Sequence, residues 1–124
     1  AAAAKVAQRF GVKKATLEEL AAMRADVTKT TYVLDVRTPE EYAAGHVPGA
    51  VNLPHDQAAA RLEELRPYRD RTIVLYCKSG RRAGIAADTL AQAGFGPLRH
   101  LAGDMPGWVS AGLPVEKAAA DTPR

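Results

Sequence analysis

The stretch TIVLYCKSGRRAGIAADTLAQAG, residues 72–94, decides the fold. Its first six residues form an unbroken run of β-branched and apolar side chains, which is typical of a strand that is covered on both faces. From residue 81 onward the apolar side chains recur at helical spacing and end at Gly94, a residue type that commonly closes helices. The stretch therefore predicts a buried strand, a short polar loop and a helix, in that order.

Strands and helices are predicted to alternate on both sides of this stretch. Further short strands are expected at residues 31–37, 50–53 and 98–103. Further helices are expected at residues 16–24, 39–44 and 56–65, and a turn-rich closing segment is expected at residues 104–115. This alternation predicts an α/β fold, with a mostly parallel sheet of about five short strands and helices on both faces.

Two of the expected helices have clear start signals. Thr16 followed by Glu19 is a capping-box pattern, in which each residue's side chain binds the other's backbone amide. Thr38 followed by Pro39 places a cap before a proline at the first helical position, and Gly45 should end this second helix.

Length and charge limit the classes of protein that fit. The chain has 124 residues, of which 47% are hydrophobic, so it can bury the core of one compact domain. We interpret residues 1–15 as an N-terminal extension, 16–115 as the domain and 116–124 as a C-terminal tail. Lys and Arg outnumber Asp and Glu by 17 to 14, but the two signs are interspersed, which does not favour nucleic acid as a partner. No apolar run approaches the roughly 20 residues that span a bilayer, so no membrane partner is expected.

The start AAAAKVAQRF lacks a methionine and has no signal-peptide core. It fits a mature form after signal cleavage, an excised domain or added foreign residues, and it favours the periplasm over the cytoplasm.

Cysteine and histidine give no sign of a metal or another cofactor. The single cysteine cannot form an internal disulfide, and the three histidines, His46, His55 and His100, lie far apart without the spacing of metal ligands.

The only cysteine, Cys77, ends the central predicted strand and begins the loop. In an open parallel sheet, ligands bind beyond the C-terminal ends of the strands, so chemistry is expected here. Gly80 allows the positive φ values with which successive backbone amides can point at one spot, and the following helix adds its free amides and positive dipole end. A thiol in such a cradle, beside Lys78, Arg81 and Arg82, is expected to be held as an anion and to attract anionic ligands.

The alternative interpretation is that Cys77 is a small buried hydrophobe, as a lone cysteine often is. Against it, Cys77 ends the strand, and four of the next five residues are polar or cationic. Cations at a helix start are electrostatically unfavourable, so Arg81 and Arg82 call for an anionic partner. These features favour a functional thiol.

Two segments together resemble the rhodanese family of sulfurtransferases: LDVRTPEEYAAGHVPGAVNLP (34–54) and VLYCKSGRRAGIAADTLAQAGFGPLRHLAGDMPGWVSAGLPV (74–115). The second segment resembles the family's C-x-x-G-x-R active-site loop at Cys77, Gly80 and Arg82. It is followed by a closing glycine-to-tryptophan segment, Gly103 to Trp108, that is one residue longer than the family's short form. The first segment resembles the family's other signature at Asp35, Arg37, Glu41, Tyr42, Gly45, His46, Gly49, Ala50, Asn52 and Leu53.

The resemblance implies a single rhodanese-like domain that acts as a sulfurtransferase of the thiosulfate type. Cys77 would accept a sulfane sulfur from a small anionic donor such as thiosulfate or mercaptopyruvate. It would then pass this sulfur from a persulfide to cyanide or to a thiol, including a protein thiol. The amides of residues 78–82, Ser79 among them, would hold the persulfide, Arg82 would close the cradle, and Lys78 or Arg81 would attract the donor, without a separate base.

Asp35 and Arg37 are interpreted as supporting residues, a buried carboxylate–arginine pair beside the loop. Trp108 is expected to be a core or pocket-wall residue. Two departures from the family pattern, Ala83 after the closing arginine and Ala102 ahead of Gly103, bear on donor preference more than on the reaction.

Two other functions stay open. A non-catalytic, partner-binding rhodanese-like module is the main alternative, although such modules usually lack the cysteine. Related phosphatases, and arsenate reductases, are the third possibility. In the phosphatases five residues separate the cysteine from the arginine, whereas here four separate Cys77 from Arg82, and the shorter ring suits a single sulfur better than a phosphate.

Overall fold

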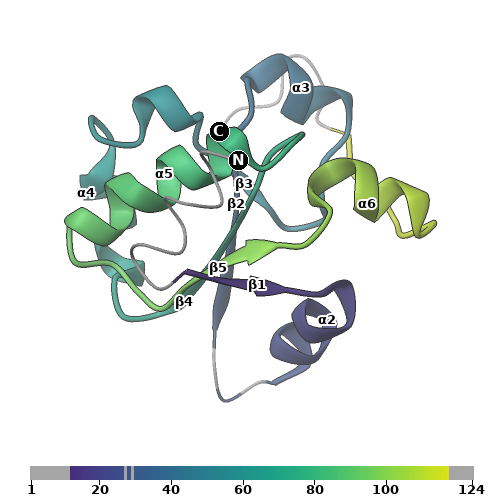
Figure 1. Ribbon diagram of the computed structural model, residues 1–124, viewed down its shortest axis with the longest axis horizontal. Coiled ribbons are helices and arrows are strands. Elements are labelled where there is room, and N and C mark those ends of the chain that lie inside the picture. The colour runs from purple at the N-terminus through teal and green to yellow at the C-terminus, as the bar shows by residue number, and fades with distance from the viewer. Residues whose placement is uncertain (1–11, 27, 29, 118–124) are drawn as a thin grey trace.

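The computed structural model describes residues 12–26, 28 and 30–117, and their central feature is a parallel sheet (Figure 1). The five strands lie in the order β1-β5-β4-β2-β3, and every neighbouring pair is parallel. They are β1 (Lys13–Ala15), β2 (Thr31–Asp35), β3 (Val51–Asn52), β4 (Thr72–Tyr76) and β5 (Leu98–Leu101). The predicted α/β fold with a parallel sheet of about five short strands is confirmed.

Helices cover both faces of this sheet. In Figure 1, α4 (Leu62–Leu65) and α5 (Arg81–Gln92) lie on one face, and α2 (Leu17–Ala25) and α6 (Asp104–Ser110) lie on the other. The remaining short helix, α3 (Pro39–Ala44), follows β2. None of the helices within the described residues is long and apolar enough to cross a membrane.

The position of the central strand β4, between two layers of helices, explains why its sequence does not alternate between polar and apolar residues. Ile73 and Leu75 face the core beneath α5, together with Cys77. Val74 and Tyr76 face the second core, which α2 and α6 cover. All five residues are fully buried, because a strand packed on both faces has no solvent side.

The expected helix starts are confirmed. The Glu19 amide donates to Thr16 Oγ1 at 3.0 Å, and the Thr16 amide donates to Glu19 Oε1 at 2.8 Å, which completes the capping box of α2. Helix α3 begins with a second capping box at Thr38 and ends before Gly45.

The helix predicted over residues 56–65 is wrong in extent. The segment begins with a short 3₁₀ helix, η1 (His55–Gln57), passes through a turn, and becomes helical again only in α4, which is followed directly by a second 3₁₀ helix, η2 (Arg66–Tyr68). Only Ala58 and Leu65 of the expected helix are buried. So small an apolar face gives a continuous helix little packing against the core, and helical propensity alone does not hold such a helix together.

The closing segment contains a helix that was not predicted. Residues 104–110 form α6, although Pro106 and two glycines suggested turns. Pro106 occupies the third helical position, where the backbone amide has no partner within the helix, so the proline costs no hydrogen bond. Trp108 of this helix is a core residue with 7% exposure, and its Nε1–H donates to the Pro114 carbonyl at 2.6 Å.

The folded unit extends beyond the boundaries expected from the sequence. Lys13–Ala15, assigned to the N-terminal extension, forms edge strand β1 and pairs with β5. Glu116, assigned to the C-terminal tail, exchanges two backbone hydrogen bonds of 2.8 and 2.9 Å with His46. Three residues without alternation carry no strand signal, so only pairing with β5 identifies β1. The rest of the extension before residue 12 and the tail after residue 117 lie outside the described residues.

Candidate active site around Cys77

Cys77 lies at the edge where the carboxyl ends of three neighbouring strands meet. It directly follows β4, while Asp35 ends the adjacent strand β2 and Asp104 lies three residues beyond the end of β5, the neighbour on the other side. This edge is the usual place for a ligand site in a parallel sheet. Cys77 is the chain's only cysteine, and it is fully buried in this structure.

Two backbone amides donate to the sulfur of Cys77. The Gly80 amide lies 3.0 Å from Sγ, and the Ala83 amide lies 3.4 Å from it. Gly80 has a φ of 93°, the left-handed region that glycine adopts without strain, and this turn brings the start of α5 against the sulfur. Gly80 falls within the amides expected from the sequence, residues 78–82. Ala83 was missed, although as the third residue of α5 it too has an amide without a helical partner.

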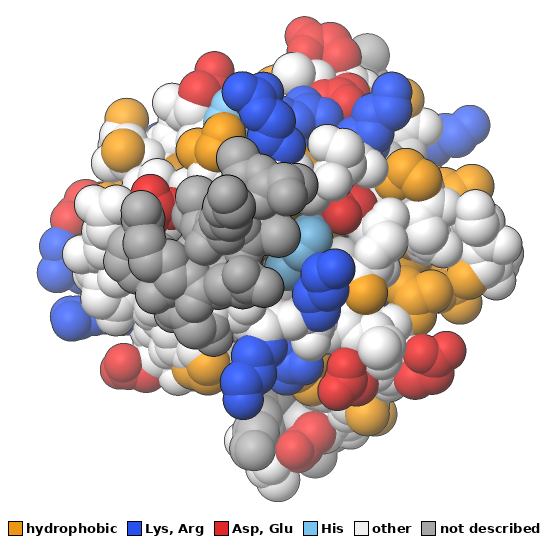
Figure 2. Space-filling view, in the orientation of Figure 1, with side chains coloured by type: hydrophobic (Ala, Val, Ile, Leu, Met, Phe, Trp, Pro, Cys, Tyr) orange, Lys and Arg blue, Asp and Glu red, His pale blue; other side chains and the backbone are white. Residues whose placement is uncertain are grey.

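The loop side chains differ in their surroundings. Lys78, Ser79 and Arg81 are exposed, whereas Arg82 is half-buried. Basic and acidic side chains are interspersed on the face of the molecule shown in Figure 2. The cations of the loop are thus a local feature of the site.

Arg82 forms an ion pair with Glu41 of α3. Its Nη1 lies 2.6 Å from Glu41 Oε1 and its Nη2 lies 3.1 Å from Oε2, a two-point contact. Hydrogen bonds from Arg82 and from the Thr38 backbone lower the pKa of the Glu41 carboxyl from 4.5 to about 2, against the opposing effect of partial burial. The guanidinium expected to close the sulfur cradle is therefore held by a carboxylate of the same chain.

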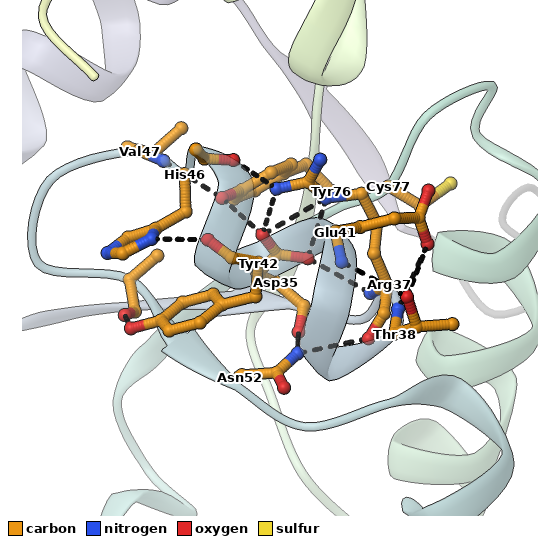
Figure 3. A network of polar contacts seen from close by, with 12 residues as sticks. Asp35, Arg37, Thr38, Glu41, Tyr42, His46, Val47, Asn52, Tyr76 and Cys77 are labelled. Carbon is orange, nitrogen blue, oxygen red and sulfur yellow. Dashed lines mark hydrogen bonds and ion pairs between the residues drawn. The ribbon is translucent and has the colours of Figure 1, made fainter. Parts of the chain in front are cut away.

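Asp35 and Arg37 form the expected buried pair beside the loop (Figure 3). Arg37 Nη2 lies 2.6 Å from Asp35 Oδ2, and the Arg37 backbone amide donates to Asp35 Oδ1 at 2.9 Å. The Tyr76 hydroxyl donates to Asp35 Oδ2 at 2.7 Å and accepts the Val47 amide at 3.0 Å. Burial, followed by the charge of Asp35, raises the pKa of the Tyr76 hydroxyl far above its usual range. The pair thus joins β2, β4 and the segment after α3.

The segment after α3 is fixed by the same network. Arg37 Nη2 donates to the Gly45 carbonyl at 2.7 Å, and His46 Nδ1 lies 2.8 Å from the Tyr42 carbonyl. The His46 ring stacks on the Tyr42 ring with the centroids 3.7 Å apart. The polar residues of the first signature are joined to one another by hydrogen bonds and ion pairs, and this network lies next to Cys77 (Figure 3).

A hollow of about 380 Å³ opens beside the loop. Two of its lining residues, Val109 and Val115, are exposed by 55% and 39%, and they belong to the small group of large apolar side chains that are exposed within the described residues. The hollow therefore combines an apolar wall with the charges of the loop. Its lining consists of Arg37, Glu41, Ala44, Gly45, Lys78, Met105, Pro106, Val109 and Val115.

Two further polar residues at the site were missed by the sequence analysis. Asp104 Oδ1 accepts the backbone amide of Cys77 at 2.9 Å, and His100 Nε2 lies 2.9 Å from the same oxygen. The position of Asp104 could have indicated it as a site residue, because it follows the end of β5 at the same sheet edge as Cys77.

Comparisons with known proteins agree with this geometry. A family model described as the rhodanese-like domain matches residues 16–111. A sulfurtransferase from Allochromatium vinosum is 38% identical over 98 residues, which cover 79% of this chain and 89% of that protein. The thiosulfate sulfurtransferase PspE from Escherichia coli is 34% identical over 70 residues, 56% of this chain and 67% of that protein. A thiosulfate sulfurtransferase structure from Pseudomonas aeruginosa is 36% identical with a TM-score of 0.78, over 98% of this chain and 22% of that one.

The chain belongs to the rhodanese-like domain family, and its fold is similar to that of the Pseudomonas aeruginosa thiosulfate sulfurtransferase. Several of its relatives are named as sulfurtransferases, and a further one, from Bacillus subtilis, is named as a putative sulfur carrier protein.

Proposed function

We propose that the protein is a sulfurtransferase that carries a sulfane sulfur on Cys77 as a persulfide. The observation that supports this most is the cradle itself: the only thiol of the chain ends the central strand, and the amides of Gly80 and Ala83 point at its sulfur. Amides aimed at one atom stabilise negative charge there without reorganising during the reaction. Relatives named as sulfurtransferases support the same class of reaction.

The first half-reaction loads the sulfur. The Cys77 thiolate attacks the outer sulfur of thiosulfate, an S–S bond forms to Sγ, and the S–S bond of the donor breaks with its electron pair leaving on sulfite. The product is a Cys77 persulfide with its negative charge on the terminal sulfur. Because Cys77 is fully buried, atoms around it must move before a donor can touch Sγ.

The second half-reaction unloads the sulfur. Cyanide or an acceptor thiolate attacks the terminal sulfur, and the S–S bond to Cys77 breaks with its electron pair returning to Sγ. Thiocyanate or an acceptor persulfide leaves, and the thiolate is regenerated. Neither half-reaction needs an external oxidant, reductant or separate base.

The surrounding residues have separate roles in this proposal. Lys78 and Arg81, both exposed, attract the anionic donor. Arg82, paired with Glu41, holds the start of α5 in place. Asp35 and Arg37 form an ion pair at the end of β2 and support the loop from that side. The apolar wall of the neighbouring hollow suits an acceptor whose thiol is attached to an organic group.

An intact-mass experiment tests the proposal. The protein is incubated with thiosulfate, measured, treated with cyanide and measured again, in parallel with Cys77→Ala. One sulfur atom should be gained, then lost to cyanide, and never gained by the alanine variant. Mercaptopyruvate and an organic persulfide are tried if thiosulfate gives nothing. Failure of all three donors contradicts sulfur transfer and favours a partner-binding module.

A further inference from the structure

The backbone of Cys77 is held on both sides by the start of α6. Asp104 Oδ1 accepts the Cys77 amide at 2.9 Å, and the Met105 amide donates to the Cys77 carbonyl at 3.0 Å. Asp104 is only 5% exposed, so this is a buried contact to a carboxylate. A charged acceptor in such a place forms a stronger hydrogen bond than a neutral one.

His100, in β5, completes this arrangement. Its Nε2 lies 2.9 Å from Asp104 Oδ1 and 3.1 Å from Oδ2, so the ring supports both oxygens. The pair also packs directly against the loop. A Cβ added to Gly80 would lie 3.1 Å from His100 Cε1 and 3.3 Å from Asp104 Oδ2. The pair therefore touches Gly80, whose amide donates to the Cys77 sulfur.

The backbone of Asp104 is itself unusual. Among the described residues it is the only one other than glycine with a positive φ, at 52°. Glycine adopts this conformation freely, whereas aspartate adopts it less readily than glycine but more readily than most other residues. Such a backbone conformation is kept in a residue other than glycine where its side chain has a function. Here the function is that of the carboxylate, which a glycine would lack.

We propose that Asp104 and His100 are positioning residues for the nucleophile, which orient the loop so that the Gly80 and Ala83 amides point at the Cys77 sulfur. Asp104 fixes the backbone of Cys77, and His100 fixes Asp104 by donating from Nε2. The proposal rests on the proposed function only in its catalytic consequence, because the orientation of the amides exists with or without sulfur transfer.

Two matched pairs of variants separate this role from simple packing. Asp104→Asn keeps an acceptor for the Cys77 amide and tolerates a positive φ, whereas Asp104→Gly adopts a positive φ freely but removes the acceptor. His100→Gln keeps a donor near the position of Nε2, whereas His100→Phe keeps the ring and removes the donor. Positioning through hydrogen bonds predicts that Asn and Gln preserve the site and that Gly and Phe damage it. Packing of the ring alone predicts the reverse order at His100.

Amide hydrogen exchange followed by NMR gives a readout that does not depend on sulfur transfer. In Asp104→Gly and His100→Phe, the Gly80 and Ala83 amides should exchange about tenfold faster or more, because the loop loses its support. The Val74 amide in β4 should be unchanged, which controls for global destabilisation. Unchanged exchange at Gly80 and Ala83 would overturn the proposal, and so would damage by His100→Gln with none by His100→Phe.

The catalytic consequence is tested by sulfur loading. For Asp104→Gly and His100→Phe, kcat should fall about tenfold with KM for thiosulfate nearly unchanged, because donor attraction is intact but the amides are misdirected. A rise in KM at constant kcat contradicts positioning. If the wild-type chain takes up no sulfur while the exchange results hold, the positioning role stands and the proposed function fails.

Discussion

Glu41 and Arg82 join the first turn of α3 to the first turn of α5 through two hydrogen bonds of 2.6 and 3.1 Å. Arg82 lies at the positive end of the α5 dipole, where a cation is unfavourable. The anionic group that compensates for this unfavourable position of Arg82 is therefore the carboxylate of Glu41, in the same chain. This contact fixes the helix whose amides face Cys77.

Glu41→Gln should destabilise the protein at neutral pH by about 1 kcal/mol, the range of a partly exposed ion pair. Gln can still accept the Thr38 amide, so the loss isolates the charge. The folded pKa of Glu41, about 2, lies below the ordinary 4.5. The stabilisation is therefore fully present above pH 4.5 and is lost as pH falls toward 2. Urea unfolding of both proteins between pH 7 and pH 3 measures it.

Glu40→Gln is the control for this prediction, since Glu40 is an exposed carboxylate in the same helical turn. It removes the same charge near the helix start without touching Arg82. A stability difference for Glu41→Gln that stays constant with pH, or that Glu40→Gln reproduces, would show that the ion pair contributes nothing.

Gly80→Ala should damage the site, whereas Gly112→Ala should not. Both glycines have positive φ, 93° and 73°, so each substitution should cost about 1 kcal/mol of backbone strain. Only at Gly80 would the new Cβ also press on His100 and Asp104, while at Gly112 nothing lies within 4 Å. Sulfur loading should fall at least about tenfold in Gly80→Ala alone. Equal loading by the two variants would argue against a tightly fitted loop.

Lys78→Glu should lower kcat/KM for thiosulfate about tenfold at low ionic strength, with a smaller effect at high salt, because exposed charges steer anions and salt screens them. Arg71→Glu is the matched control: it makes the same change of charge on an exposed residue before β4, at the opposite end of the strand from Cys77. If both variants slow the reaction equally, the effect is one of net charge rather than of the loop.

The sequence alone determined the parts of the fold that depend on neighbouring residues. The apolar run before Cys77 predicts a strand buried on both faces, because each of its side chains needs an apolar partner whichever face it occupies. Thr16 and Thr38 predict helix starts, because a cap contacts an amide only three residues away. Gly80 predicts the turn at the sulfur, because the freedom of glycine to adopt positive φ is a local property of that residue.

Contacts between distant segments could be identified only from the tertiary structure. Strand β1 forms because it pairs with the backbone edge of β5, and residues 56–65 form no continuous helix because too few of them pack against the core. Glu41 lies 41 residues from Arg82, and Asp104 lies 27 residues from Cys77. No local pattern encodes such pairs, since they form only where the parallel strands bring their carboxyl ends to one edge. The sequence therefore predicted Cys77 and its loop as the candidate site, and the fold supplied the residues that hold them.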